Sequence, residues 1–276
     1  MTLKRPLLWL ISIVLALLTM SSHAGTFFNR QSTSGTAPQS QFLTIDGVKI
    51  HYFVQGSGEP VVLIHAWLSS AESIWVRPGT MAQLAKHNRV IALDLAGYGE
   101  SDKPDKASAY GNAWIEQVYQ LMNHLNIRKA HIVGYSMGSM VALKFIVAHP
   151  DRTLSGLLGG MGYLEEGSDN QKKWAERSKP QWSGVAQLAL TPAQVKSVNV
   201  PVEMVIGSRD PTMKSYVEPL LQVRTDWPVV EIPGKGHISA VGSQQLKDDI
   251  ASWLAQHEPR AVVTGRFQKN GAEAKP

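Results

Sequence analysis

The chain has 276 residues, of which 43% are hydrophobic and 18% are charged, and its formal net charge is +5. This composition is ordinary for a globular protein and excludes extensive disorder. Because the sequence contains no cysteine, disulfides, thiolate nucleophiles and cysteine-bound metals are excluded together. The basic residues form no stripe interleaved with aromatic side chains, so we expect no nucleic-acid partner.

The first 24 residues are predicted to be a signal peptide. Lys4 and Arg5 precede an apolar segment, 7–20, and Ser22-His23-Ala24 offers small residues at the positions that a signal peptidase reads. The apolar segment is short for a membrane span and no basic stop-transfer cluster follows it, although an uncleaved anchor is the alternative. We therefore expect a periplasmic or secreted protein that begins at Gly25 and has no stable membrane insertion after cleavage.

The mature chain alternates between strand-like and helix-like segments. Residues 25–40 are rich in Ser, Thr, Gly and Gln and are predicted to be a flexible lead-in. The Asp46-Gly47 pair predicts a hairpin of 42–45 with 48–54, and unbroken apolar runs predict buried parallel strands. These strands are expected at 60–64, 90–95, 131–134, 154–159, 200–206 and 229–232, with helices at 75–87, 114–126, 137–149, 213–224 and 243–256.

This alternation predicts a mostly parallel sheet with helices on both of its faces. One polar segment, 163–199, interrupts it and contains Trp174 and Trp182. We expect two short helices there, forming a small lid over the carboxyl edge of the sheet. The α/β core is accordingly assigned to 41–162 and 200–256, and 257–276 to a polar tail.

The most informative motif is Gly134-Tyr135-Ser136-Met137-Gly138, which follows the apolar run 131–133 and opens into a helix-like run. A strand, a sharp turn and a helix in this order make a nucleophile elbow, which lifts the serine oxygen out of the backbone. Glycine at the two ends of the motif allows close packing and strained dihedral angles.

A serine hydroxyl is a weak nucleophile and needs a histidine to take its proton and an acid to orient that histidine. His237 lies in a glycine-rich loop after the last predicted strand, and Asp210 follows the strand that ends at Ile206. The chain order of serine, aspartate and histidine is the one expected when all three follow successive parallel strands. Glu165 or Glu166, near the lid, is the alternative acid.

The transition state of acyl transfer also needs N–H donors for the oxygen that becomes negative. Met137 is expected to supply one from the N-terminus of the helix that follows the nucleophile. The Trp67 amide is expected to supply the other, in the loop that follows Ile64. His65 is expected to brace that loop by side-chain hydrogen bonds rather than act as a second base.

The motifs HAWLSS (65–70), DLAGYGESDKP (94–104), GYSMG (134–138), GSRD (207–210) and GKGH (234–237) together resemble the α/β-hydrolase superfamily, in its esterase, lipase and peroxidase-like branch. The resemblance covers 42–256. It implies an eight-stranded sheet with an antiparallel second strand, a lid after strand six, and Ser136, Asp210 and His237 as the catalytic triad. The chain departs from the family pattern at Ala66, where glycine is usual, and at Ala96, where arginine is frequent.

We expect from these residues a serine hydrolase that cleaves an ester-like bond of a small or medium apolar substrate through an acyl-enzyme, with neither a metal nor an organic cofactor. Carbon–carbon bond hydrolysis and perhydrolysis on the same triad are the alternatives among enzymes. A hydrolase-fold protein that binds a ligand without turnover is the alternative outside enzymes. The sequence leaves substrate identity and oligomeric state open.

Overall fold

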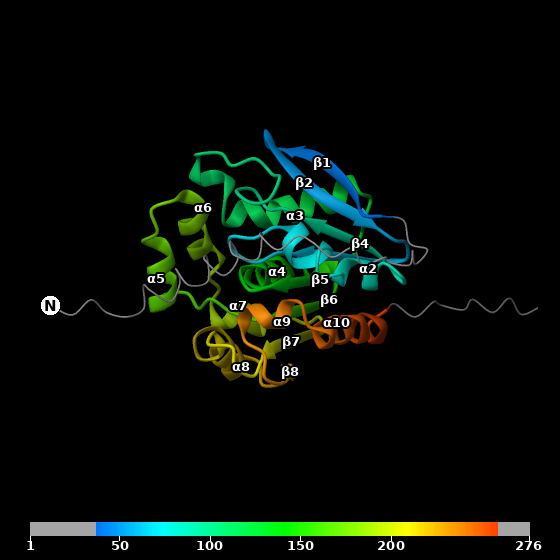
Figure 1. Cartoon of the computed structure of the whole chain (residues 1–276). Coiled ribbons are helices and arrows are strands. Elements are labelled where there is room, and N and C mark those ends of the chain that lie inside the picture. Colours follow the sequence, from blue (N-terminus) through cyan, green and yellow to red (C-terminus); the bar gives the residue numbers. More distant parts are fainter. Residues whose placement is uncertain (1–36, 259–276) are drawn as a thin grey trace, which may run out of the picture. The chain divides into compact units, whose positions relative to one another are not determined.

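The computed structural model describes residues 37–258 (Figure 1). The predicted signal peptide, most of the predicted lead-in and nearly all of the predicted polar tail lie outside these residues. Within the described part, no helix has both the length and the apolar character that crossing a membrane requires.

The described residues form an eight-stranded sheet with the strand order β1-β2-β4-β3-β5-β6-β7-β8. Strand β2 is antiparallel to both of its neighbours, and the pairs from β4 to β8 are parallel. The predicted fold class is therefore confirmed. The strands are β1 (Gln39–Ile45), β2 (Val48–Gln55), β3 (Glu59–Ile64), β4 (Asn88–Leu93), β5 (Ala130–Tyr135), β6 (Thr153–Gly159), β7 (Val202–Gly207) and β8 (Val229–Ile232).

The first two strands form the predicted hairpin. Ile45 pairs with Val48, and the turn residues Asp46 and Gly47 have φ values of +49° and +78°. Two consecutive residues with positive φ are what a tight type I′ turn requires. Strand β1 begins at Gln39, so Gln39 and Ser40 belong to the sheet rather than to the predicted lead-in.

Helices connect the strands and cover both faces of the sheet (Figure 1). The α-helices are α2 (Thr80–Leu84), α3 (Asn112–His124), α4 (Met137–Ala148), α5 (Asp169–Ala175), α6 (Pro180–Ser183), α7 (Pro192–Lys196), α8 (Glu218–Val223), α9 (His237–Val241) and α10 (Gln244–Gln256). Single π-helical turns occupy Glu72–Val76 and Met213–Val217, and 3₁₀ turns occupy Ala107–Ala109, Pro150–Arg152 and Gly184–Leu188.

Two hydrophobic cores lie on the two faces of the sheet. Along β3, Val62 and Ile64 belong to one core, and Val61 and Leu63 belong to the other, because successive side chains of a strand point to opposite faces. Helices α3, α4 and α8 contribute to the first core, and α2, α9 and α10 to the second. The strands are therefore buried on both faces, which explains their unbroken apolar runs.

The predicted helix over 75–87 is wrong. The structure has a π-helical turn that ends at Val76 and a separate short helix, α2, that begins at Thr80. Pro78 and Gly79 lie between them, and Gly79 has a φ of +85°. A left-handed residue at this point cannot continue a right-handed helix, so the amphipathic pattern is divided between two elements.

The segment 163–199, which we call the cap segment, contains three short α-helices, α5 to α7, and a 3₁₀ turn, rather than the two helices expected. It packs against loops that follow β3 and β4. The Tyr98 hydroxyl donates to the Gln181 carbonyl at 3.3 Å, and the rings of Trp67 and Trp174 have centroids 5.3 Å apart. The cap segment therefore lies against the carboxyl edge of the sheet.

Candidate active site

Ser136 lies at a sharp turn between the end of β5 and the start of α4. Its φ of 57° and ψ of −122° are strained for a residue with a side chain. A Cβ atom on Gly134 would lie 2.2 Å from the Gly138 carbonyl oxygen, and one on Gly138 would lie 2.2 Å from the Ile64 carbonyl oxygen. Both glycines are therefore required by close backbone contacts, and the turn has the geometry of a nucleophile elbow.

The structure brings the three predicted side chains together. Ser136 Oγ lies 2.8 Å from His237 Nε2, and His237 Nδ1 lies 2.7 Å from Asp210 Oδ2. With Nδ1–H donating to the carboxylate, Nε2 is left unprotonated and accepts the serine O–H. This is the arrangement in which an imidazole can act as a general base toward a serine.

Asp210 is held by more than its contact with the imidazole. Its Oδ1 accepts the Thr212 amide N–H at 2.9 Å, and the Thr212 hydroxyl lies 2.7 Å from the same oxygen and 2.5 Å from the Gly160 carbonyl. The side chain of Asp210 is fully buried. Thr212 therefore ties the acid to the loop after β6, a role that the sequence indicated only by its position two residues after Asp210.

The base is held in a similar way by Tyr135, which the sequence analysis did not assign. The Tyr135 hydroxyl donates to the His237 carbonyl at 2.6 Å, and burial raises the pKa of this phenol, so it stays protonated. A Cβ on Gly160 would lie 3.1 Å from His237 Cε1. Tyr135, the residue before the nucleophile, thus fixes the loop that contains His237. The only sign of this role in the sequence was the position of Tyr135 inside the elbow motif.

Comparison with known proteins agrees with the fold. The family model described as the alpha/beta hydrolase fold matches residues 59–194. The chain belongs to the α/β-hydrolase superfamily. A 2-hydroxymuconate semialdehyde hydrolase from Pseudomonas sp. is 31% identical over 128 residues, which are 45% of each chain. An uncharacterised protein of Mycobacterium tuberculosis is 35% identical over 127 residues, 45% of this chain and 36% of the relative.

The chain thus spans less than half of the length of these two relatives. Among solved structures, a serine hydrolase involved in carbazole degradation superposes with a TM-score of 0.65 at 24% identity, covering 80% of this chain and all of that one. At this identity the likeness concerns the α/β-hydrolase fold alone.

Met137 and Trp67, the expected N–H donors for an oxyanion, belong to two backbone segments that approach each other. Met137 is the first residue of α4, so its N–H has no acceptor within the helix. Trp67 lies in the loop after β3, and the close approach of Gly138 to the Ile64 and His65 carbonyls places the first turn of α4 directly against the start of that loop. The two amides come from neighbouring backbone segments.

His65 braces the same loop, as its position suggested. Its Nδ1 lies 2.8 Å from the Ala66 carbonyl oxygen, and its Nε2 lies 3.1 Å from the Leu95 nitrogen. A single neutral tautomer satisfies both contacts, donating from Nδ1 and accepting at Nε2. Complete burial lowers the pKa of His65, against the opposing effects of the Asp94 charge and the Ala66 hydrogen bond.

The loop that contains Ala96, where relatives often have arginine, is held by other side chains. The Ala96 N–H donates to Gln117 Oε1 at 3.0 Å, and Trp114 Nε1–H donates to the Ala96 carbonyl at 3.1 Å. Both partners are buried residues of α3. Helix α3 therefore supplies hydrogen bonds at the position where the family's arginine is missing.

An aromatic cluster joins the predicted oxyanion loop to the cap segment. The Trp67 ring makes edge contacts with Trp174 and Trp182, with centroids 5.3 Å and 5.8 Å apart. The Arg177 guanidinium lies 5.8 Å from the Trp67 ring centre and 5.2 Å from that of Trp174. This guanidinium makes no hydrogen bond or ion pair with any other residue in 37–258.

A second Ser–His–Asp set is formed by Ser40 in β1, His51 in β2 and Asp94, which directly follows β4. Ser40 Oγ lies 2.8 Å from His51 Nε2, and His51 Nδ1 lies 2.9 Å from Asp94 Oδ2. Ser40 is a residue of strand β1 paired with Phe53, so it has neither a nucleophile elbow nor a helix N-terminus behind it. Asp94 also accepts the Ala71 amide N–H at 2.7 Å. The set therefore has a structural role, in which Asp94 joins β2 to the loop that contains Ala71.

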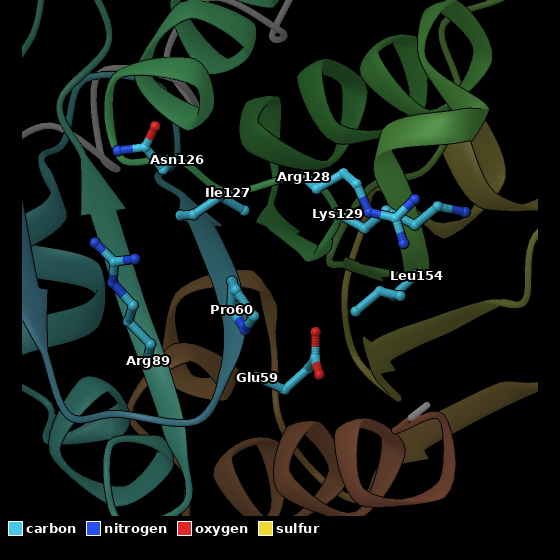
Figure 2. Close-up of a pocket in the computed structure, with 8 residues that line it drawn as sticks. All are labelled: Glu59, Pro60, Arg89, Asn126, Ile127, Arg128, Lys129 and Leu154. Atoms are coloured by element: carbon cyan, nitrogen blue, oxygen red, sulfur yellow. The ribbon is translucent and has the colours of Figure 1, made fainter. Parts of the chain in front are cut away.

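A pocket of about 330 Å³ lies at the opposite, amino-terminal edge of the sheet (Figure 2). Glu59, the first residue of β3, lines this pocket together with three cationic side chains, Arg89, Arg128 and Lys129. The other lining residues are Pro60, Asn126, Ile127 and Leu154. None of these residues is a serine, cysteine or histidine, so the pocket lacks the serine–histidine pair found at Ser136. The candidate site is therefore the cluster around Ser136.

Proposed function

We propose that this protein is a serine hydrolase that cleaves an ester-like bond through an acyl-enzyme. The observation that supports the proposal most directly is the continuous contact from Ser136 through His237 to Asp210, with distances of 2.8 Å and 2.7 Å. Its position on a nucleophile elbow separates this set from the Ser40 set, which has similar distances. Membership of the α/β-hydrolase superfamily agrees with the proposal.

In the proposed reaction, Ser136 Oγ attacks the carbonyl carbon of the ester while His237 Nε2 takes the serine proton. The carbonyl oxygen becomes negative and accepts the N–H groups of Met137 and Trp67. The imidazolium then protonates the leaving alcohol, and Asp210 remains ionised and stabilises the imidazolium. A water molecule deprotonated by His237 attacks the acyl-enzyme and releases the acid.

The surroundings of the site favour an apolar acyl or aryl group on the substrate. Leu68 and Ile238 are 37% and 46% exposed, and each directly follows a proposed site residue, Trp67 and His237 respectively. Exposed large apolar side chains are expected where a protein binds apolar surface. The Trp67, Trp174 and Trp182 rings add aromatic contact area beside the oxyanion loop.

Hydrolysis of a carbon–carbon bond on the same residues is the second candidate. Two relatives are named as hydrolases of 2-hydroxymuconate semialdehyde and of 2-hydroxy-6-oxo-2,4-heptadienoate, and the second of these names denotes a carboxylate. The Arg177 guanidinium, which has donors without acceptors in the described residues, would suit such an acid group. Both candidates pass through an oxyanion and use the same three side chains.

The proposal is tested with the purified protein, a series of p-nitrophenyl esters of increasing chain length, and a fluorophosphonate probe. Ser136→Ala should lower ester turnover by several orders of magnitude, as the loss of a triad nucleophile does, and should abolish probe labelling. The matched control is Ser40→Ala, which removes the serine of the other Ser–His–Asp set and should leave both unchanged. If folded protein gave no Ser136 adduct and no turnover, a ligand-binding protein would be favoured instead.

A further inference from the structure

The loop that follows β6 carries a methionine against the proposed nucleophile. In the stretch Gly159-Gly160-Met161-Gly162, which runs from the last residue of β6 into this loop, Met161 is the one residue with a side chain larger than hydrogen. The Ser136 N–H donates to the Gly159 carbonyl at 2.7 Å, and the Gly160 N–H donates to the Val205 carbonyl at 2.8 Å. These bonds fix the loop, and Met161 Sδ lies 3.6 Å from Ser136 Oγ.

Met161 also differs from most other methionines in its exposure. Seven of the nine methionines lie in the described residues. Five of these seven are at most 2% exposed, namely Met81, Met122, Met137, Met140 and Met204. Met161 and Met213 are only partly buried. A small oxidant dissolved in water therefore reaches these two sulfur atoms more readily than the other five.

We propose that Met161 is a sulfoxidation site whose modification switches off Ser136, an inference that rests on the proposed serine hydrolase activity. A peroxide transfers one oxygen atom to Met161 Sδ. The thioether is oxidised by two electrons to a sulfoxide, and hydrogen peroxide is reduced to water. No cysteine competes for the oxidant, because the chain contains none.

The sulfoxide would act on the proton of Ser136. A thioether sulfur is a weak acceptor, so in the reduced protein the serine O–H is available to His237 Nε2 at 2.8 Å. A sulfoxide is polar and carries an oxygen that accepts hydrogen bonds. Placed beside Ser136, it competes with His237 for the single hydroxyl proton and fills space where the substrate carbonyl must approach.

The test measures ester turnover before and after treatment with hydrogen peroxide, for wild type, Met161→Leu and Met213→Leu. Turnover before treatment that depends on Ser136 checks the proposed function separately. Mass spectrometry of peptides measures sulfoxide at each methionine, and a mixture of methionine sulfoxide reductases A and B then reduces the protein.

We expect wild type and Met213→Leu to lose activity in proportion to Met161 sulfoxide, by about tenfold or more, because general-base catalysis contributes roughly 10²–10⁴. Met161→Leu should keep most of its own untreated activity, and the reductases should restore wild type. Met161→Gln, which places a permanent acceptor there, should be slow without peroxide. The inference is overturned if Met161 stays reduced while Met213 is oxidised, or if wild type with oxidised Met161 remains active. If Met161→Leu did not fold, the wild-type and Met213→Leu data would decide alone.

Discussion

Ser136 and His237 are 101 positions apart in the chain, yet Ser136 Oγ and His237 Nε2 lie 2.8 Å from each other. Ser136 follows β5, and His237 follows the loop after β8. Loops at the carboxyl ends of parallel strands share one edge of the sheet, which is why distant residues can meet there.

The role of Asp210 is tested by Asp210→Asn. The amide keeps the size of the side chain but cannot stabilise an imidazolium or enforce the required tautomer, so kcat should fall by about 10³–10⁴. Glu165→Gln and Glu166→Gln remove the alternative acids and should leave ester kinetics close to wild type. A larger loss in either glutamate variant than in Asp210→Asn would assign the acid to the cap segment instead.

The packing of the elbow is tested by Gly138→Ala. The added methyl would lie 2.2 Å and 2.6 Å from the carbonyl oxygens of Ile64 and His65, which are backbone atoms that cannot rotate away. We expect a loss of stability of about 1–3 kcal/mol from overpacking, together with a large loss of turnover from displacement of the oxyanion loop. Gly242→Ala is the matched control, because nothing lies within 4 Å of its added Cβ. Equal urea midpoints and kinetics in both variants would contradict this account of the glycine.

His131 is predicted to make stability depend on pH. Burial lowers its pKa to about 4, with a smaller contribution from His257, and its Nε2 has no hydrogen-bond partner in the described structure. Because an unfolded histidine has a pKa near 6.5, the unfolded state binds more protons between about pH 6.5 and 4. The folded state therefore favours the neutral His131 imidazole, and this preference stabilises the protein by roughly 3 kcal/mol above about pH 6.5. The stabilisation is lost as the pH falls from about 6.5 to 4.

The measurement is the free energy of unfolding in urea at several pH values for wild type and His131→Asn. The variant should be less stable at neutral pH, because it loses packing, but it should show a shallower decline toward acid. His87→Asn, at an exposed position, should keep the wild-type slope. Parallel curves for wild type and His131→Asn would show that His131 does not contribute to the acid sensitivity.

Arg177 is expected to select for substrates with an acid group. Arg177→Met should lower kcat/KM for the mono-p-nitrophenyl ester of succinate by about fivefold, which corresponds to ~1 kcal/mol for a partly exposed ion pair. The neutral p-nitrophenyl butyrate should change much less, and Arg177→Lys should recover part of the preference. Equal changes for both esters would mean that Arg177 only packs on the Trp67 and Trp174 rings.

Much of the fold was predictable from the sequence because it depends on local patterns. Apolar runs buried on both faces identified the parallel strands within two residues at each end, and Asp46-Gly47 identified the hairpin. The pattern failed over 75–87, where Pro78 and a left-handed Gly79 divide one amphipathic stretch into two elements. It also gave too few helices in the cap segment, since helices as short as α6 and α7 have too few turns to show a period.

The sequence by itself determined the nucleophile elbow and the order of serine, aspartate and histidine, because these are set by short motifs next to strands. Only the tertiary structure decided which side chains surround them: Thr212 on Asp210, Tyr135 on the His237 loop, and Met161 against Ser136. It also distinguished the Ser136 set from the Ser40 set. The physical reason is that such contacts join loops far apart in the chain, and their geometry is set by how the strands and helices pack rather than by any local pattern.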